Sequence, residues 1–337
     1  MKAVELQSAF GVENVKLVDR PEPTAGPGQV LVRMRAFSLN YRDLLIIKGQ
    51  YNPKLKLSLT ILSDGVGEVA ASGDGVTRYK TGDRVAGAFL QNWIAGQLTD
   101  ARAKTALGGG GEDGVLAEYR VFDEEGLVHV PPHLSDEEAA TLPCAGVTAW
   151  HALVTSGQIK AGDVVLTQGT GGVSLFATQF TRLLGGRVII TSSSDEKLSR
   201  ARALGADEGI NYKTDPAWEE KVRNLTGGVG VDHVVELGGA GTFAKSLRAV
   251  RTGGTISLIG VLSGGAGEIN PVGILMKSVR VQGIYVGSRE MFETMNRAIT
   301  LHKLKPVVDR IYAVAEIQSA LRSMENGAHF GKICLRF

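Results

Sequence analysis

The middle of the chain alternates short apolar segments with longer amphipathic ones. Apolar, partly β-branched runs at Val164–Thr167 and Val188–Thr191 flank a helix-compatible stretch that begins after Gly171. The same alternation continues as far as Gly287. The other strand candidates are Val231–Glu236, Thr255–Leu262 and Val279–Val286, and the helical candidates between them include Glu196–Leu204, Trp218–Thr226 and Thr242–Ala249. Strands that alternate with helices in this way predict a parallel, doubly wound sheet.

The first 125 or so residues have a different rhythm. Short apolar strands at Val30–Met34, Gly65–Ala71 and Arg84–Phe89 are separated by glycine-rich turns, which is typical of a β-rich, barrel-like domain. The tail after Arg289 mixes helix and strand patterns, and we expect it to rejoin the amino-terminal domain. The predicted fold is therefore α/β with two domains, one formed by residues 1–124 and 289–337 and the other by residues 125–288.

One turn carries a specific chemical signal. The apolar run ending at Gln168 leads directly into Gly169-Thr-Gly171-Gly172-Val-Ser174 and then into the helical stretch. Glycines at a strand-to-helix turn allow a sharp bend and let a pyrophosphate approach the N–H groups of the helix start. Ser174 stands where the strict dinucleotide fingerprint has its last glycine, but serine is small enough to keep the helix close to the sheet.

Composition narrows the range of functions. The 337 residues exceed the usual size of a single core, and 43% apolar with 21% charged residues is ordinary globular usage. A net charge of +2 gives no electrostatic case for nucleic acid or an anionic membrane. No apolar run reaches the roughly 20 residues that span a bilayer, and the first residues do not read as a signal peptide. With only Cys144 and Cys334, the chain fits a reducing, cytoplasmic compartment.

Several ordered motifs extend the match beyond the glycine turn. With these motifs the chain resembles the medium-chain dehydrogenase/reductase superfamily along essentially its whole length. The motifs are Gly28-Gln-Val-Leu-Val-Arg33, Asn40-Tyr-Arg-Asp43, Gly82-Asp-Arg-Val85, Ala117-Glu-Tyr119, Leu142-Pro-Cys-Ala-Gly-Val-Thr-Ala-Trp150 and Ala203-Leu-Gly-Ala-Asp207. The resemblance implies a GroES-like β-barrel domain, a Rossmann domain with a doubly wound parallel sheet, and an active site in the cleft between them.

The resemblance also locates the zinc ligands of metal-dependent relatives. They fall at Asn40, at the pair Ser63-Asp64 and at Cys144, so only the last position keeps a thiol. A catalytic zinc site needs three protein ligands, mostly thiolate or imidazole. The structural zinc lobe needs four close cysteines, and residues 89–115 contain none. We therefore expect no zinc, and a branch related to quinone oxidoreductases and enoyl-thioester reductases.

The end of the second strand of the βαβ unit indicates which cofactor binds. NAD-specific folds place an acidic residue there, whereas this strand ends in Ser192, Ser193 and Ser194. Hydroxyls and a nearby cation, Lys197, suit a 2′-phosphate, so we expect NADP(H). By resemblance, Tyr212 also reaches this phosphate, and further segments border the nicotinamide. The expected cofactor-binding residues are Gly169, Thr170, Gly171, Gly172, Val173, Ser192, Ser193, Lys197, Tyr212, Gly260, Val261, Leu262, Val286, Gly287 and Ser288.

Hydride addition to a conjugated carbonyl compound builds negative charge on the carbonyl oxygen, so a donor is required. Tyr51 lies where enoyl-thioester reductases carry an active-site tyrosine, and Asn40 adds an amide N–H. Alternatively, Tyr51 is an aromatic side chain that lines the cleft and has no catalytic role. Tyr41, Ser63, Trp93 and Cys144 are the expected substrate-pocket residues, although a small buried side chain is the simpler role for Cys144. Residues 89–115, with Gly108–Gly111, form either a lid or wall or a packing insertion.

The leading hypothesis is a zinc-independent, NADPH-dependent oxidoreductase acting on a quinone, enone or other activated C=C or C=O group. Two alternatives stay open: a metal-free alcohol or carbonyl dehydrogenase, and a non-catalytic NADPH-binding sensor or scaffold. By resemblance, Val279–Val286 is apolar enough to pair with a second copy, so we expect a homodimer and no nucleic-acid or membrane partner.

Overall fold

The computed structural model describes residues 1–109 and 111–337; Gly110, within the predicted flexible glycine run, lies outside the described residues. Over the described residues the chain divides into two compact units. Unit 1 comprises residues 1–147 and 287–337, and unit 2 comprises residues 148–286. The segment 125–147, which the sequence analysis assigned to the second domain, clusters with unit 1. The tail, residues 287–337, clusters with the amino-terminal unit.

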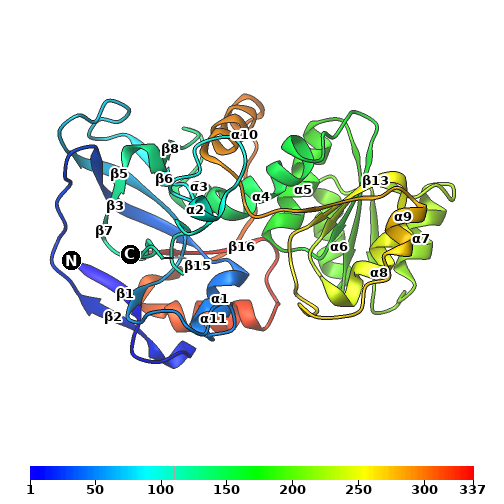
Figure 1. Cartoon of the computed structure of the whole chain (residues 1–337), viewed down its shortest axis with the longest axis horizontal. Helices are drawn as coiled ribbons and strands as arrows, with labels where there is room; N and C mark the ends of the chain where they lie inside the picture. The colour runs from blue at the N-terminus through cyan, green and yellow to red at the C-terminus, as the bar shows by residue number, and fades with distance from the viewer. Residues whose placement is uncertain (110) are drawn as a thin grey trace. The chain divides into compact units, whose positions relative to one another are not determined.

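Unit 1 is built around a mixed sheet with the order β15-β16-β3-β5-β6-β8, and β7 pairs with β3 (Figure 1). The carboxyl-terminal strand β16 pairs antiparallel with β3, which is why the tail belongs to this unit. A smaller sheet has the order β2-β1-β4. The bounds are β1 Lys2–Leu6, β2 Val15–Asp19, β3 Gln29–Ser38, β4 Leu59–Thr60, β5 Asp64–Ser72, β6 Arg84–Gly87, β7 Tyr119–Asp123, β8 Leu127–His129, β15 Val308–Ala313 and β16 Lys332–Arg336.

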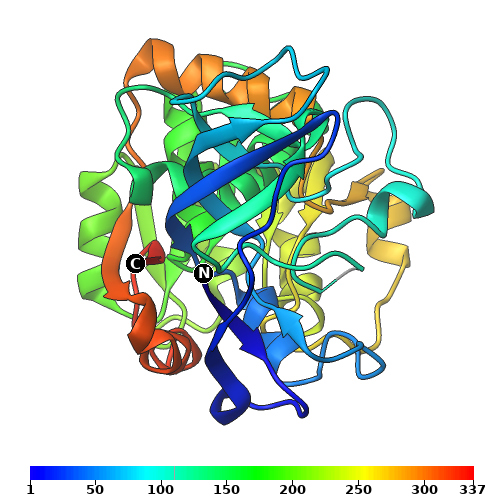
Figure 2. The same ribbon diagram turned by 90° about the vertical axis from the view of Figure 1, so that its left-hand side faces the viewer.

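Helices close the ends and faces of unit 1, and their apolar faces join its core. Leu44 and Ile47 of α1 and Leu321 of α11 are buried together with Val32 and Phe37 of β3. Figure 2 shows α11, in red, close to the β1–β2 hairpin, in dark blue. The bounds are α1 Tyr41–Ile47, α2 Asp100–Ala103, α3 Asp136–Ala140, α10 Arg289–His302 and α11 Ile317–Glu325; Val147–Trp150 forms α4, which spans the division between the units.

The segment 89–115 is packed into unit 1 over its described residues. Leu107 and Val115 are fully buried members of the core, and Leu90 forms a β-bridge with Ala106. These contacts favour the packing interpretation of this segment over a lid.

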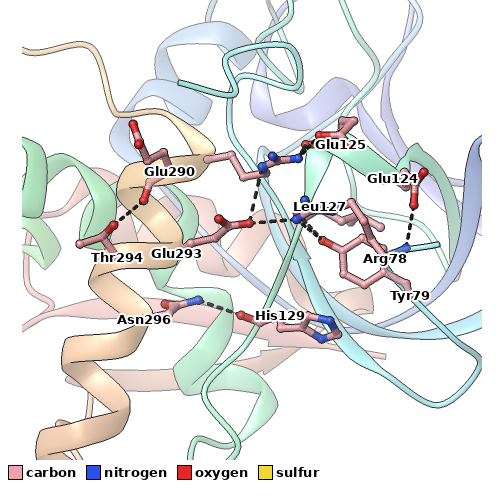
Figure 3. Close-up of polar contacts among 11 residues, drawn as sticks. Arg78, Tyr79, Glu124, Glu125, Leu127, His129, Glu290, Glu293, Thr294 and Asn296 are labelled. Carbon is pink, nitrogen blue, oxygen red and sulfur yellow. Dashed lines mark hydrogen bonds and ion pairs between the residues drawn. The ribbon is translucent and has the colours of Figure 1, made fainter. Parts of the chain in front are cut away.

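Polar contacts fasten α10 to the strands of unit 1 (Figure 3). Glu293 accepts a hydrogen bond from Arg78 Nη2 at 2.9 Å and pairs with Arg289 within its own helix. Asn296 Nδ2 donates to His129 O at 2.8 Å. Because these partners come from the 78–129 region, the helix that follows unit 2 in sequence is held to unit 1.

Unit 2 is a parallel sheet with the order β11-β10-β9-β12-β13-β14. The first strand, β9, lies in the middle, so the chain winds outward first through β10 and β11 and then through β12, β13 and β14. The reversal lies between β9 and β12, and ligands of open α/β sheets bind at such a switch point, outside the carboxyl ends of the strands. The predicted doubly wound parallel sheet is confirmed.

The predicted strands and helices of unit 2 are present in the predicted order with shifted ends, and the structure adds strand β11 and helix α9, which were not among the candidates. The strands are β9 Val164–Gln168, β10 Arg187–Ser192, β11 Glu208–Asn211, β12 Val231–Glu236, β13 Val250–Leu258 and β14 Arg280–Gly283. The helices are α5 Gly172–Leu183, α6 Asp195–Ala203, α7 Trp218–Leu225, α8 Ala240–Ala249 and α9 Val272–Met276. Strand β13 begins earlier and ends earlier than predicted, which leaves Gly260–Leu262 in a loop. No helix in residues 1–109 and 111–337 is long and apolar enough to cross a membrane.

Candidate active site

The glycine turn of unit 2 connects β9 to α5 and has the backbone that a phosphate site needs. Gly169 has φ +74°, a conformation that favours glycine, and a Cβ built on Gly169 or Gly171 would meet no atom within 4 Å. Gly171 precedes the first turn of α5, whose N–H groups lack intrahelical partners. The turn therefore leaves an open cradle beside unsatisfied donors, which fits a pyrophosphate.

Ser174, at the position of the last fingerprint glycine, is fully buried, and its Oγ donates to Gln168 O at 2.6 Å. The serine thus ties the first turn of α5 to the end of β9. Serine can replace glycine at this position because its side chain is small and its hydroxyl donates to a buried carbonyl oxygen.

A buried polar network lies at the carboxyl ends of β9 and β12. Glu236 has no exposed surface, and its Oε1 accepts from Gly238 N at 2.9 Å and Gly239 N at 3.0 Å. Its Oε2 accepts from Gln168 Nε2 at 2.8 Å and from the Ser246 hydroxyl. Gln168 Oε1 accepts in turn from the N–H groups of residues 237 and 238, both at 3.1 Å. The network joins the two strands at the switch point and fixes the residue that precedes Gly169.

The residues predicted to hold a 2′-phosphate gather at the end of β10. Ser192 is 3% exposed, and Ser194 begins α6 by accepting from Lys197 N at 3.3 Å. Asp195 lies in the first turn of α6, where it accepts from Asn211 Nδ2 at 3.0 Å. Tyr212 is 42% exposed, and its N–H donates to Ser192 O at 3.0 Å. Serines, lysine and tyrosine thus share one edge of the sheet.

The remaining cofactor candidates lie in two places. Val261 and Leu262 are exposed in the loop after β13. Val286, Gly287 and Ser288 span the division between the units. Val286 has φ +53°, an unusual conformation for a β-branched residue, and its carbonyl lies 2.7 Å from His151 Nδ1.

In unit 1, the positions that carry zinc ligands in metal-dependent relatives form a connected cluster. Ser63 Oγ donates to Asp64 Oδ1 at 2.7 Å, and Cys144 N donates to Asp64 Oδ2 at 3.2 Å. Asn40 Nδ2 lies 3.5 Å from Ser63 Oγ. Lys332 Nζ completes the cluster by donating to Asn40 Oδ1 at 2.6 Å. We refer to Asn40, Ser63, Asp64, Cys144 and Lys332 as the polar cluster.

Burial governs the ionisation of the polar cluster. Burial raises the pKa of the Asp64 carboxyl, and this is opposed by the Lys332 ammonium and by hydrogen bonds from Asn40 and Ser63. Burial also raises the pKa of the Cys144 thiol well above its usual range, helped by the Asp64 charge. Cys144 is therefore a protonated thiol at neutral pH, in keeping with its interpretation as a small structural side chain.

Lys332 is the residue of this cluster that the sequence analysis missed. A signal existed: a lysine opens the otherwise apolar strand β16, whose residues Ile333, Cys334 and Leu335 are fully buried. A charged residue that begins a buried strand needs an internal partner. Nothing in the sequence identified Asn40 as that partner, since the two are 292 positions apart.

The other predicted residues of unit 1 have separate surroundings. Tyr51 is 41% exposed, and the Arg42 guanidinium carbon lies 5.4 Å from the centre of its ring. Trp93 is 3% exposed, and its Nε1 donates to Gly96 O at 2.8 Å within its own loop. Tyr41 is the exposed first residue of α1. The geometry thus brings Asn40, Ser63 and Cys144 together, while Trp93 packs inside unit 1.

Asp43 gives a testable pH dependence. Burial, with the Asp64 charge, raises the pKa of this carboxyl to about 6, against the opposing effects of Arg42 and of the Asn40 N–H, which donates to Asp43 Oδ2 at 2.8 Å. A pKa raised by folding means that the stabilising contribution is complete below the unfolded value and is lost as pH rises through about 6. Between about pH 4 and pH 7, wild-type protein should lose roughly 2–3 kcal/mol of unfolding free energy relative to Asp43→Asn. Urea titrations of both proteins across this range measure the difference; parallel pH profiles would contradict it.

Comparisons with known proteins agree with this architecture. Residues 26–132 match the alcohol dehydrogenase GroES-like domain, and residues 172–300 match the zinc-binding dehydrogenase family. A zinc-type alcohol dehydrogenase-like protein of Schizosaccharomyces pombe is 42% identical over 92% of this chain and 91% of its own length. The chain belongs to the medium-chain dehydrogenase/reductase superfamily. It is an oxidoreductase of this superfamily.

Other members of the superfamily differ in what their names say they do. A quinone oxidoreductase of Pseudomonas aeruginosa is 32% identical over 94% of this chain and 88% of its own. A solved Sinorhizobium meliloti protein described as an alcohol dehydrogenase is 44% identical with a TM-score of 0.91, covering 100% of this chain and 99% of its own. A mycobacterial protein solved with NADPH is 30% identical with a TM-score of 0.85 over the full length of both chains. These relatives support a nicotinamide cofactor for this medium-chain dehydrogenase/reductase.

The polar cluster does not fit the catalytic zinc that the family description implies. It offers an amide, a hydroxyl, a carboxyl and a thiol whose pKa is raised. Most ligands of zinc sites are instead thiolates and imidazoles. Asn40 Oδ1 is already bonded to an ammonium. Among the residues that the structure describes, no three His, Cys, Asp or Glu side chains form a metal-binding group.

Proposed function

We propose that this protein is a zinc-independent, NADPH-dependent reductase of quinones, enones or other carbonyl-activated double bonds. The observation that carries the proposal is the polar cluster: an amide, a hydroxyl, a carboxyl and a thiol occupy the positions of the metal ligands of zinc enzymes, and the Lys332 ammonium donates to the amide. An acceptor that is already conjugated to a carbonyl needs a hydrogen-bond donor rather than a strong Lewis acid.

In this proposal unit 2 holds the cofactor, with the pyrophosphate at Gly169–Gly172 and the 2′-phosphate at Ser192, Ser193 and Lys197. The bound NADPH supplies the hydride. Asn40 Nδ2 donates a hydrogen bond to the carbonyl oxygen of the acceptor, which stabilises the negative charge that hydride addition places there. The Tyr51 phenol delivers a proton to the product.

The experiment is a turnover assay with NADPH and a panel of quinones, enals, enones, enoyl-thioesters and simple alcohols, on wild-type protein and Tyr51→Phe. We expect oxidation of NADPH with conjugated acceptors and a fall of at least about 10-fold in kcat for Tyr51→Phe, the lower range for losing a general acid. Tyr312→Phe, which removes a hydroxyl from β15 of unit 1, where no site residue is predicted, is the matched control. Alcohol oxidation without enone reduction would favour the metal-free alcohol dehydrogenase, and NADPH binding without any turnover would favour the sensor or scaffold. Unchanged kcat in Tyr51→Phe would remove Tyr51 from the proton-donor role.

Cofactor preference gives a separate prediction. The combined variant Ser192→Ala/Lys197→Ala should bind NADPH roughly 10–100-fold more weakly, because each charge-assisted hydrogen bond contributes about 1.5–3 kcal/mol. Affinity for NADH, which lacks the 2′-phosphate, should change little. Lys160→Ala is the control, since this exposed lysine precedes β9 at its amino end, away from the strand ends that hold the cofactor residues. Equal losses for both cofactors, measured by fluorescence titration, would refute the assignment.

A further inference from the structure

Lys332 is a buried cation in the middle of unit 1. The residue is 4% exposed and begins β16, whose following residues are part of the core. Its ammonium donates to Leu39 O at 2.5 Å and to Asn40 Oδ1 at 2.6 Å. A buried ammonium is retained only where acceptors and negative charge compensate for lost hydration, so its surroundings define its role.

The ammonium determines how the Asn40 amide is oriented. A lysine ammonium has donors and no acceptor, so the amide atom that faces it must be the oxygen. Nδ2 is then turned the other way, where Ser63 Oγ lies 3.5 Å distant, at the limit of a hydrogen bond. The Asn40 N–H groups therefore face away from the ammonium, toward Ser63 and the Asp64 carboxyl, which also accepts from the Asn40 side chain.

The ammonium also balances charge. Asp64 has no exposed surface, and its two oxygens accept from Ser63 Oγ at 2.7 Å and from Cys144 N at 3.2 Å. Neither donor is a cation, whereas the Lys332 charge acts favourably on this carboxylate. The polar cluster thus places a carboxyl group and an ammonium group in one buried site, where the ammonium opposes the burial-driven rise in the pKa of Asp64.

We propose that Lys332 is the resident cation of this site, taking the electrostatic place of the metal ion of zinc-dependent relatives and acting on the reaction through Asn40. This inference rests on the proposed function, since it assigns how Asn40 becomes its donor. Lys332 is a positioning residue: it fixes the amide with Nδ2 turned away from the ammonium, and it polarises the amide, because a donor on the amide oxygen strengthens the N–H groups of the same amide. The positive charge further favours a developing oxyanion at Nδ2.

The kinetic test is a double-mutant cycle with Asn40→Ala, Lys332→Met and the double variant, plus Lys332→Arg. Lys332→Met should lower kcat about 10–100-fold, as expected for weakening one oxyanion donor, with a smaller change in KM. Lys332→Arg keeps the charge and the donors and should recover most of this loss. In the Asn40→Ala background, Lys332→Met should change kcat by less than about 3-fold, because the residue through which it acts is gone. Multiplicative losses in the double variant, or unchanged kcat in folded Lys332→Met, would overturn the proposal.

A second measurement needs no turnover and separates this inference from the proposed function. The variant Asn40→Cys/Ser63→His restores zinc-type ligands beside Cys144, and its Zn²⁺ affinity is measured by competition with a chromophoric chelator. Adding Lys332→Met should tighten Zn²⁺ binding at least about 10-fold, because a like charge leaves the site, whereas adding Lys332→Arg should not. Equal affinities in all three backgrounds would refute the electrostatic role of Lys332 even if the wild-type enzyme reduces enones. Conversely, if the wild-type protein has no activity but the zinc-ligand variants bind Zn²⁺ more tightly once Lys332 is replaced by Met, only the proposed function is overturned.

Circular dichroism and thermal unfolding of every variant establish that it is folded. If Lys332→Met alone does not fold, Asp64→Asn/Lys332→Met removes both charges together and should fold, because no uncompensated charge remains buried. The kinetic and zinc comparisons then use this pair with Asp64→Asn as the reference. In that series, kcat and Zn²⁺ affinity that are both unchanged by Lys332→Met would contradict the proposal.

Discussion

Glu236→Ala is expected to lower the free energy of unfolding of unit 2 by roughly 3–5 kcal/mol, because it leaves a cavity and several buried donors without an acceptor. The carboxylate accepts from Gly238 N, Gly239 N, Gln168 Nε2 and the Thr242 and Ser246 hydroxyls. All of these lie where β9 and β12 end, so the Gly169 turn should lose order as well. Urea unfolding followed by tryptophan fluorescence measures the loss, and Trp150 and Trp218 report on unit 2.

An exchange of the two central residues is the matched control. Glu236→Gln alone places an amide NH₂ among donors, and Gln168→Glu alone places two carboxylates side by side. In Gln168→Glu/Glu236→Gln the number of donors and acceptors is restored, since residue 168 then accepts and residue 236 donates along the same 2.8 Å contact. We expect the exchange to recover at least half of the free energy lost by the less stable single variant. If the losses of the single variants simply add, the network is not the source of the stability.

Gly169→Ala is expected to weaken NADPH binding roughly 10–100-fold while costing only about 1–2 kcal/mol of stability. The stability cost comes from φ +74°, which an L side chain adopts with strain. The larger binding cost arises because the added Cβ would enter the open space that the turn leaves for a phosphate, and would keep the phosphate from the N–H groups.

Gly228→Ala separates the two effects. Gly228 also belongs to unit 2, has φ +83°, and likewise has no atom within 4 Å of a built Cβ. It lies between α7 and β12, at the amino end of the strand rather than at the carboxyl end where the cofactor site is predicted. Both variants should therefore lose similar stability, and only Gly169→Ala should lose NADPH affinity. Similar affinity losses in both would show that backbone strain, and not phosphate approach, explains the effect.

The local pattern of apolar and polar residues was enough to predict most helices and strands of unit 2. Val231–Glu236 and Trp218–Leu225 are continuous apolar or amphipathic segments, and their ends agree with the structure within a residue. Strand β13 begins at Val250, five residues before the predicted start, because Val250 pairs with Val231 of β12; after a register shift, Thr255–Leu258 pair with both β12 and β14. Strands β1, β2 and β4 of the smaller antiparallel sheet were not predicted; the two residues of β4, for example, pair with Glu5 and Leu6, more than 50 positions away.

Among the candidate site residues, those located from sequence alone have proposed roles that depend only on neighbouring positions. Gly169–Ser174 and Ser192–Lys197 are contiguous segments, and their roles follow from backbone conformation and residue type within a few positions. Trp93 was expected to line a pocket, but its indole is buried with a partner three residues away. Aromatic residues are ambiguous in sequence because burial in a core and exposure in a pocket require the same side chain.

The sequence by itself determined the superfamily, the glycine turn and the departure from zinc ligands at Asn40, Ser63 and Asp64, because each is a statement about which residue occupies which position of a motif. Only the tertiary structure decided what compensates for that departure. The pairing of β16 with β3 places Lys332 beside Asn40, although the two are 292 positions apart in sequence. Hydrogen bonds to Asp64 connect residues 63 and 144. Such contacts depend on strand register and burial, which are properties of the folded chain, and no local pattern of residues records them.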